Sequence, residues 1–257
     1  MIVLFTDFGL NGPYIGQMQA SIFRFAPEAK IVNLFANAPL FNPVAAAHLL
    51  STYVAEFPVA AVFLAVVDPG VGSQRRPIVA EIDGRYFVGP DNGLFDVVAA
   101  RAKTALIREI IWQPERLSAS FHGRDLFAPV AAHIDNETLP DAWLAKPVQF
   151  SSEISADDLL EIIYLDDYGN AMTGLRASMI EPEVEILING HRLKRARTFS
   201  DVERGQPFWY SNSNGLVEIS VNCGSAMRQL GLSIGMPFEM VKPEQRVIDE
   251  DTSSNLI

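Results

Sequence analysis

An apolar run that ends abruptly in an acidic turn constrains the fold of this chain more than any other feature. Residues 62–67 are all apolar, and they lead directly into Asp68-Pro69-Gly70. A strand that is apolar on both faces is typical of a parallel sheet covered by helices, and ligands bind such sheets outside the carboxyl ends of the strands. Asp68 therefore stands where chemistry usually happens, although Asp-Pro-Gly is also a common turn. This stretch alone leaves both interpretations open.

Strands and helices alternate through the first half of the chain. The run 2–6 ends in Asp7-Phe8-Gly9, so a second strand is expected to bring a carboxylate to the same edge of the sheet. Apolar spacing predicts helices over 13–25, 42–56 and 94–102, and an Ala-rich helix that ends near residue 134. Strands are expected over 30–34 and 105–111, and a hairpin is expected to join 78–82 to 85–88. The alternation predicts an α/β fold with a Rossmann-like, mostly parallel sheet and helices on both faces.

The pattern changes after a polar stretch at 139–157, which we interpret as a linker. We expect an α/β domain over 1–150, a second domain over 157–243, and a loose tail over 244–257. Short runs in the second domain predict a small sheet or barrel. They lie at 159–165, 184–188, 208–210, 216–221 and 238–241, and Asn189-Gly190 marks a hairpin turn.

Composition limits the partners and the compartment. The chain has 257 residues, a formal net charge of -11 and a sequence pI of about 4.8, so nucleic acid and anionic membranes are unexpected partners. Cys223 is the only cysteine, which excludes an internal disulfide and a cysteine-rich zinc site. The first residues lack the basic start of a signal peptide, and no apolar run approaches the ~20 residues of a membrane span. We expect a cytoplasmic protein.

Common nucleotide signatures are absent from the sequence. Gly9, Gly12 and Gly16 follow the first strand without the spacing of a dinucleotide-binding loop, and there is no phosphate-binding loop with its lysine. The sequence therefore disfavours a dinucleotide or ATP site.

Six short polar motifs follow one another in a chain that is otherwise apolar. They are TDFG at 6–9, VVDPGVG at 66–72, GPDNGL at 89–94, FHGRDLFAPVAA at 121–132, DDYGN at 166–170 and NSNG at 212–215. In this combination and order the chain resembles the S-adenosylmethionine hydroxide adenosyltransferases, which are relatives of the S-adenosylmethionine-dependent chlorinases and fluorinases. The resemblance extends over nearly the whole chain.

The resemblance implies both an architecture and an activity. It implies an N-terminal α/β domain with a smaller C-terminal β-barrel, in a homotrimer whose sites lie between one subunit's N-terminal domain and its neighbour's C-terminal domain. The implied reaction is hydrolysis of S-adenosyl-L-methionine to adenosine and L-methionine by in-line attack of an activated water at the ribose 5′ carbon. Because a sulfonium leaves as a neutral thioether, this attack needs no general acid, metal or cofactor, only a positioned water in a dry site.

Asp68, Arg75 and His122 stand at the positions of the family's water-activating group. Arg75 can fix the Asp68 carboxylate bidentately, while His122 holds the water or relays its proton. Outside these motifs, Arg75 would be interpreted as a solvated surface residue and His122 as a capping or packing histidine.

The candidate substrate-binding residues lie in both domains. Asp7 can accept hydrogen bonds from both ribose hydroxyls, with a cap or turn as its alternative role. The resemblance assigns Asp166 and Ser213 to the ammonium and carboxylate of methionine and Asn170 to adenine, although both motifs are also good turns. Phe41 can lie along the substrate or be an exposed loop aromatic. Asn222 and Ala226 complete the candidate set.

The chain departs from the family pattern after the second strand. Members commonly have IVDI followed by Thr or Ser and His, whereas residues 31–36 are IVNLFA, without the carboxylate and the histidine. This puts the pocket wall near 37–41 in doubt. Two alternatives stay open: a halogenase acting on S-adenosylmethionine, and a non-catalytic protein that binds S-adenosylmethionine or adenosine.

Overall fold

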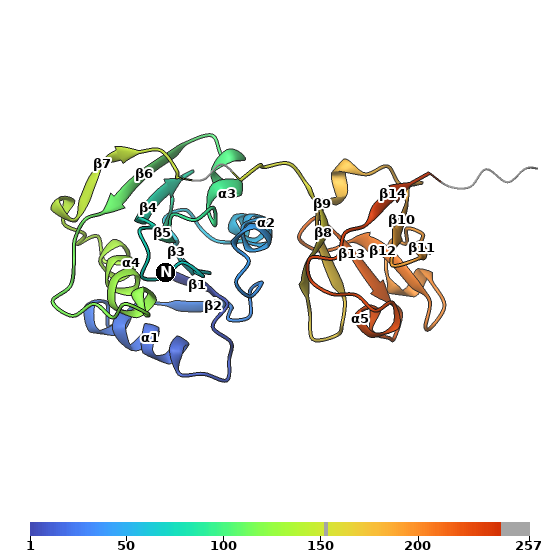
Figure 1. Cartoon of the computed structure of the whole chain (residues 1–257), viewed down its shortest axis with the longest axis horizontal. Coiled ribbons are helices and arrows are strands. Elements are labelled where there is room, and N and C mark those ends of the chain that lie inside the picture. The colour runs from blue at the N-terminus through green and yellow to red at the C-terminus, as the bar shows by residue number, and fades with distance from the viewer. Residues whose placement is uncertain (152–153, 243–257) are drawn as a thin grey trace, which may run out of the picture.

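The computed structural model describes residues 1–151 and 154–242, which form two lobes joined by the segment after β7 (Figure 1). The expected tail over 244–257 lies outside the described residues. Within the described residues, no helix is both long and apolar enough to cross a membrane.

The N-terminal lobe is built on one seven-stranded sheet with the order β2-β1-β3-β5-β4-β6-β7. Its strands are β1 (Ile2–Thr6), β2 (Ile31–Phe35), β3 (Val62–Val66), β4 (Pro77–Ile82), β5 (Arg85–Pro90), β6 (Ala105–Ile110) and β7 (Leu144–Val148). β1, β2, β3, β5 and β6 run in one direction, and β4 and β7 run against them. The expected α/β fold with a mostly parallel sheet is confirmed.

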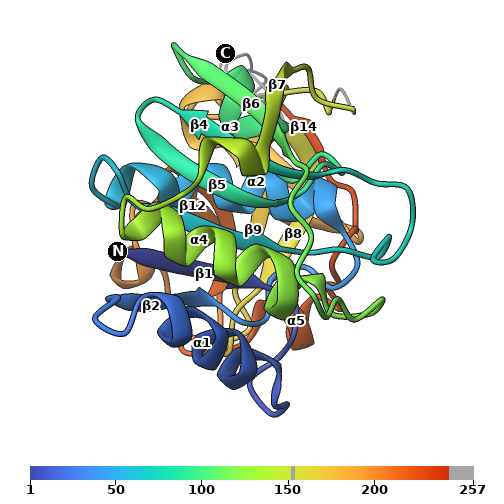
Figure 2. The ribbon, with the colours of Figure 1, turned by 90° about the vertical axis from the view of Figure 1, so that its left-hand side faces the viewer.

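Helices cover both faces of this sheet, which explains why its central strands are apolar throughout. α1 (Tyr14–Phe25) and α4 (Ala128–Asp135) lie together on one face (Figure 2). α2 (Pro43–Tyr53) and α3 (Asp96–Ala100) cover the other. Successive side chains of a strand point to opposite faces, so Leu4 packs in the α1–α4 layer while Phe5 packs in the α2–α3 layer.

The predicted linker is held firmly to the N-terminal lobe, and part of it is a strand. β7 lies inside the stretch that we interpreted as a linker. Ser151 follows β7 and donates hydrogen bonds from its backbone N–H and its hydroxyl to the buried carboxylate of Asp91. Asp91 also pairs with Arg76. Asp96 accepts from the backbone N–H of Ile154. The GPDNGL motif therefore contributes Asp91 as an anchor for the connection between the lobes.

The C-terminal lobe consists of two antiparallel sheets and the short helix α5 (Ala226–Gln229). β8 (Leu159–Leu165), β9 (Ala171–Arg176), β12 (Pro207–Ser211) and β13 (Leu216–Val221) form one, and β10 (Glu185–Ile188), β11 (His191–Leu193) and β14 (Glu239–Val241) form the other. Single bridges, Glu161–Pro237 and Arg195–Trp209, connect the two sheets. The hairpin turn at Asn189-Gly190 is confirmed, with both residues at positive φ. β9 and α5 were not predicted.

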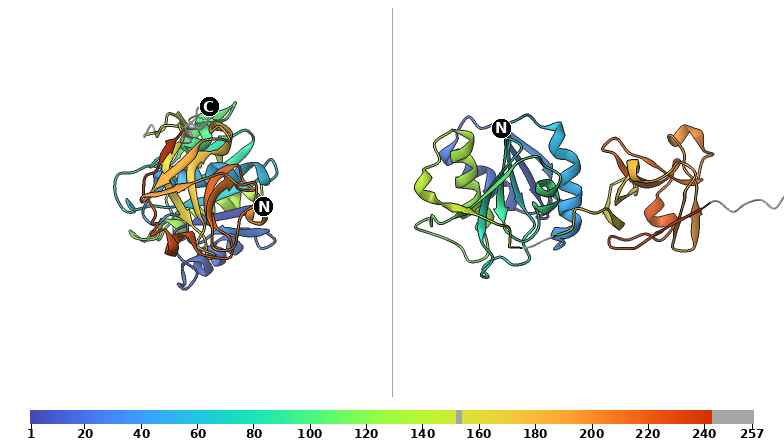
Figure 3. Two further views of the ribbon diagram at one scale, coloured as in Figure 1. Left: turned by 90° about the vertical axis from the view of Figure 1, so that its right-hand side faces the viewer. Right: turned by 90° about the horizontal axis from the view of Figure 1, so that it is seen from above.

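The C-terminal lobe faces the α2 side of the large sheet (Figure 3), and an aromatic contact joins the two lobes there. The Phe35 ring, at the end of β2, packs edge-on against Tyr53 of α2 and Tyr164 of β8, with ring centroids 5.2 Å apart in each pair. Beside it, Asp158 pairs with Arg101 and Arg176 from the two lobes. Phe35 belongs to the segment that departs from the family pattern, so in this chain the departing segment contributes to the contact between lobes.

Candidate active site

Two adjacent parallel strands bring Asp7 and Asp68 to the same edge of the sheet. β1 and β3 pair in register up to Thr6 and Val66, and each acidic residue follows within two positions of its strand's end. The edge opens into a cavity of about 650 Å³ that both carboxylates line. His122 and Phe41 line the same cavity, so four of the predicted site residues meet there.

Arg75 connects Asp68 to His122. Its Nε lies 3.1 and 2.9 Å from the two Asp68 carboxylate oxygens, and its Nη2 lies 2.5 Å from Oδ2 of Asp68 and 2.9 Å from Nδ1 of His122. The guanidinium also stacks over the Phe127 ring at 5.2 Å. The side chains of Arg75 and Asp68 are only 9% and 4% exposed, so water screens this pair weakly. Arg75 therefore contacts both of the residues that were grouped with it from the sequence.

The contact with Arg75 fixes the tautomer of His122. A guanidinium only donates hydrogen bonds, so Nδ1 of His122 accepts, and the proton of a neutral imidazole resides on Nε2. Burial, and then the positive charge of Arg75, lower the pKa of His122 below its ordinary value, so the ring is neutral at pH 7. His122 is thus a donor from Nε2, which suits holding a water oxygen better than removing its proton.

His122 stands at the entry to an irregular helical turn. Residues Gly123–Phe127 form a π-helical turn that continues directly into α4, and such turns are frequent at functional sites. Hydrogen bonds from the Arg124 guanidinium to Asp125 and to Gln17 of α1 hold this turn against α1. The FHGRDLF motif therefore contributes Phe121, His122, Gly123 and Arg124 to the cavity wall, and it also contains Asp125, which holds Arg124 in place.

Asp7 is held by the loop that contains Phe41. The backbone N–H of Phe41 donates to Oδ2 of Asp7 at 3.0 Å, in a left-handed turn with φ of 56° at Phe41. Burial is the main cause that raises the pKa of Asp7, and the nearby Asp68 charge adds to it, while the Phe41 bond opposes it. The Phe41 side chain is 68% exposed at the cavity rim.

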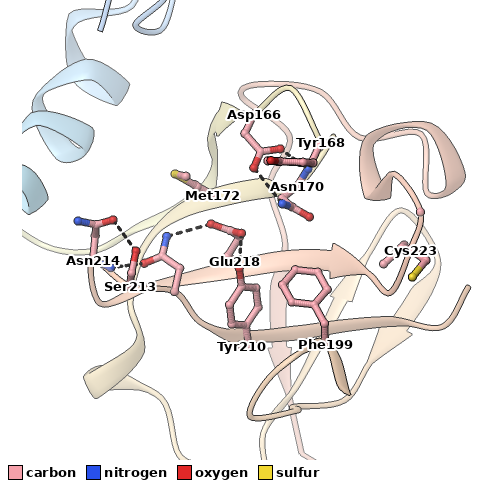
Figure 4. A pocket seen from close by; sticks show the side chains of 13 residues that line it. Asp166, Tyr168, Asn170, Met172, Phe199, Tyr210, Ser213, Asn214, Glu218 and Cys223 are labelled. Atoms are coloured by element: carbon pink, nitrogen blue, oxygen red, sulfur yellow. Dashed lines mark hydrogen bonds between the residues drawn. The ribbon is translucent and has the colours of Figure 1, made fainter. Parts of the chain in front are cut away.

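The C-terminal lobe contains a second cavity, of about 760 Å³. Asp166, Asn170 and Ser213, which were predicted from sequence, line it (Figure 4). The Asp166 carboxylate accepts the backbone N–H of Asn170 at 2.8 Å and its side-chain amide at 2.9 Å. Gly169 allows this turn, since it has φ of 84° and a Cβ there would lie 2.0 Å from Oγ of Ser225.

Several residues that line this second cavity were not predicted from the sequence. Met172, Phe199, Tyr210, Glu218 and Cys223 line it. Tyr210 and Glu218 are directly opposite each other on β12 and β13. Alternation along each strand was visible in the sequence, but the register between strands, which brings these side chains together, was not.

Two of the predicted substrate-binding residues line neither cavity. The Asn222 side chain donates to the backbone carbonyl of Val202, and Ala226 is fully buried in the core of the lobe. Val221 and Cys223, their near neighbours, line the C-terminal cavity instead. The placement of Asn222 and Ala226 gives no support to their predicted substrate contacts.

Comparison with known proteins identifies the family. Family models for the S-adenosylmethionine hydroxide adenosyltransferase N-terminal and C-terminal domains match residues 2–143 and 160–239. This chain belongs to the S-adenosylmethionine hydroxide adenosyltransferase family. A relative from Thermus thermophilus, named (R)-S-adenosyl-L-methionine hydrolase, is 37% identical over 93% of this chain and 99% of its own. One of the same name from Salinispora tropica is 32% identical over 90% and 93%.

Solved structures agree with this assignment. An uncharacterized conserved protein from Thermotoga maritima superposes with a TM-score of 0.84, at 32% identity, covering 94% of this chain and all of the other. A conserved hypothetical protein from Thermus thermophilus superposes with a TM-score of 0.74, at 34% identity, covering 93% and 99%. This family member thus shares both lobes with its relatives.

In this member of the hydroxide adenosyltransferase family, seven of the predicted site residues line one of two cavities that share no lining residue. Asp7, Phe41, Asp68 and His122 line the N-terminal cavity, and Asp166, Asn170 and Ser213 line the C-terminal one. Among the described residues, no group of three or more His, Cys, Asp or Glu side chains could hold a metal ion.

Proposed function

We propose that this protein hydrolyses S-adenosyl-L-methionine to adenosine and L-methionine. The observation that supports this most is the pairing of Arg75 with Asp68 and His122 in the cavity that Asp7 also lines. The curated relatives carry the name (R)-S-adenosyl-L-methionine hydrolase, which makes the (R) sulfonium epimer the expected substrate.

In the proposed mechanism, a water oxygen attacks the ribose 5′ carbon while the bond from that carbon to sulfur breaks. The bonding electrons pass to sulfur, so methionine leaves as a neutral thioether and no acid has to protonate it. The water loses one proton in forming the 5′ hydroxyl. The Asp68 carboxylate accepts a hydrogen bond from the water and takes up that proton, while the Nε2–H of His122 donates a hydrogen bond to the same water oxygen.

Arg75 organises both partners of the water. It fixes the Asp68 carboxylate through both oxygens, and it keeps His122 neutral and in the Nε2–H tautomer. This geometry is set before substrate binds, so little reorganisation is needed during reaction.

We assign five of the predicted residues to substrate binding. Asp7 accepts hydrogen bonds from the two ribose hydroxyls, and the Phe41 ring, whose backbone Asp7 holds, lies along the substrate. In the C-terminal cavity Asp166 binds the ammonium of methionine and Ser213 its carboxylate. Asn170 donates its amide to Asp166, which leaves its carbonyl oxygen for a donor such as the amino group of adenine.

The complete site is proposed to form between subunits of a homotrimer. Each chain holds the two halves of the site in separate cavities, and a neighbouring copy could bring the missing half to each. We propose domains over 1–150 and 157–243. The second is proposed to close into a small barrel, because the two single bridges would join its sheets at both edges. A cytoplasmic location and independence of metals and cofactors stay predictions.

Product analysis tests the proposed function. Purified protein is incubated with each sulfonium epimer of S-adenosylmethionine, and adenosine and methionine are separated by chromatography. We expect both products in equal amounts from the (R) epimer, and at least tenfold less from an Asp68→Asn variant. A 5′-halogenated nucleoside formed with added chloride or fluoride would favour the halogenase. Tight binding without turnover, unchanged in Asp68→Asn, would favour the non-catalytic alternative.

A further inference from the structure

The C-terminal cavity contains a buried carboxylate that has no role in the account above. Glu218 lies in the middle of β13 and is 3% exposed, yet it lines the cavity. The Tyr210 hydroxyl donates to one of its oxygens at 2.6 Å, and the Asn212 amide donates to the other at 3.0 Å. Figure 4 shows Glu218 between Tyr210 on one side and Asp166 with Asn170 on the other.

Both hydrogen-bond donors of Glu218 are neutral. In the described part of the chain, no Lys, Arg or His lines this cavity, and Glu218 makes no ion pair. A buried carboxylate without a cation is costly to maintain. Burial raises the pKa of Glu218, the negative charge of Asp166 raises it further, and only the bonds from Tyr210 and Asn212 lower it.

Glu218 and Asp166 together make the cavity complementary to a ligand with more than one positive charge. The substrate of the proposed reaction has two, an ammonium and a sulfonium. Asp166 is assigned to the ammonium, and Ser213, a neutral donor, to the single negative charge of the substrate. After these assignments, the sulfonium is the one charge of the substrate that has no partner. Glu218 is the acidic residue of the cavity that has no cation beside it.

We propose that Glu218 is a specificity-determining residue that favours the cationic sulfonium over a neutral thioether, an inference that rests on the proposed function. Its charge acts on the ground state, because the sulfonium is neutralised as the carbon–sulfur bond breaks. An interaction that is strong in the bound substrate and weaker in the transition state lowers KM without raising kcat. The same charge gives no advantage to adenosine or to S-adenosylhomocysteine, the neutral thioether, and so it limits inhibition by both.

The test compares Glu218→Gln with the unaltered protein. The amide keeps the shape of the side chain and removes its charge. We expect KM for S-adenosylmethionine to rise about tenfold, with kcat within threefold, which corresponds to about 1.4 kcal/mol of substrate binding. Titration calorimetry in an Asp68→Asn background measures binding without turnover. There, the preference for S-adenosylmethionine over S-adenosylhomocysteine should fall about tenfold, with adenosine affinity unchanged.

Glu185→Gln is the matched control. Glu185 is also a buried glutamate of the C-terminal lobe, but it pairs with Arg192 and lines neither cavity described above. We expect this variant to lower thermal stability and to leave both KM and the thioether discrimination unchanged.

The outcomes separate this inference from the proposed function. Normal turnover with unchanged discrimination in Glu218→Gln would overturn the inference and leave the function standing. Equal weakening of all three ligands would also overturn it, since Glu218 would then only support the pocket. If the unaltered protein shows no turnover, the proposed function fails. The binding preference, and its loss in Glu218→Gln, then still decides the inference, and absence of a preference overturns it.

Discussion

Replacing Arg75 by lysine should lower turnover while leaving the fold intact. A lysine keeps the positive charge beside Asp68, but one ammonium cannot reproduce a guanidinium that contacts both Asp68 oxygens and Nδ1 of His122. At least one charge-assisted hydrogen bond is lost, and such bonds are worth about 1.5–3 kcal/mol. If that loss falls on the transition state, kcat decreases about 10- to 150-fold, since each ~1.4 kcal/mol is tenfold in rate.

The adjacent residue provides a matched control. Arg76 also forms a 2.5 Å ion pair with a buried aspartate, but this aspartate is Asp91, which anchors the connection between the lobes. Arg76→Lys should lower the melting temperature and leave kcat within twofold. Both variants are assayed by chromatographic separation of adenosine at saturating substrate. A folded Arg75→Lys with the unaltered kcat, or an equal loss of kcat in Arg76→Lys, would refute the reasoning.

Three further predictions concern protons and the anchor of the lobes. Because burial and the Arg75 charge lower the pKa of His122 in the folded protein, its neutral form persists below pH 6.5. The acid decline of kcat/KM should therefore begin below that value, and a decline centred above pH 7 would contradict this. Burial and the Arg101 charge lower the pKa of His48 to about 4, so the unfolded chain binds the extra proton between pH 6.5 and 4. The free energy of unfolding, measured by denaturant titration, should therefore fall by ~3 kcal/mol as the pH is lowered from 6.5 to 4. In His48→Gln this decline should be smaller. Asp91→Ala should cost about 3–5 kcal/mol of unfolding free energy by leaving Arg76 and Ser151 unpaired, with kcat retained by the folded fraction; an unchanged melting temperature would contradict this.

The proximity of Asp7 and Asp68 could be predicted from the sequence because both residues follow strand ends. Asp7 and Asp68 each follow an apolar run, and parallel strands place their carboxyl ends at one edge. Arg75 is seven residues beyond Asp68 in a short loop, so their pairing required little knowledge of the fold. His122 comes from a distant segment, and only the family resemblance connected it to the other two.

The C-terminal site was predicted less completely because it depends on pairing between strands. Glu218 faces Tyr210 through the β12–β13 register, and Met172 reaches the same cavity from β9. These side chains belong to no turn motif, so nothing local in the sequence marks them as neighbours. Asn222 and Ala226 are the converse case, since they follow β13 closely in sequence while their side chains line neither cavity, and their substrate contacts stay a prediction.

The linker was misjudged for a similar reason. Its polar residues indicated a linker between domains, but they did not indicate the strand β7 or the contact of Ser151 with Asp91, which lies far from it in sequence. The same holds for Phe35, whose contacts with Tyr53 and Tyr164 exist only once both lobes are folded.

Turnover in oxygen-18 water tests the central claim most directly. If water held by Asp68 and His122 attacks the 5′ carbon, adenosine formed from S-adenosylmethionine gains one oxygen-18 atom at its 5′ oxygen, and mass spectrometry of the separated nucleoside detects it. Methionine should contain no label from the reaction. Absence of adenosine, or adenosine whose 5′ oxygen is unlabelled, would contradict the account.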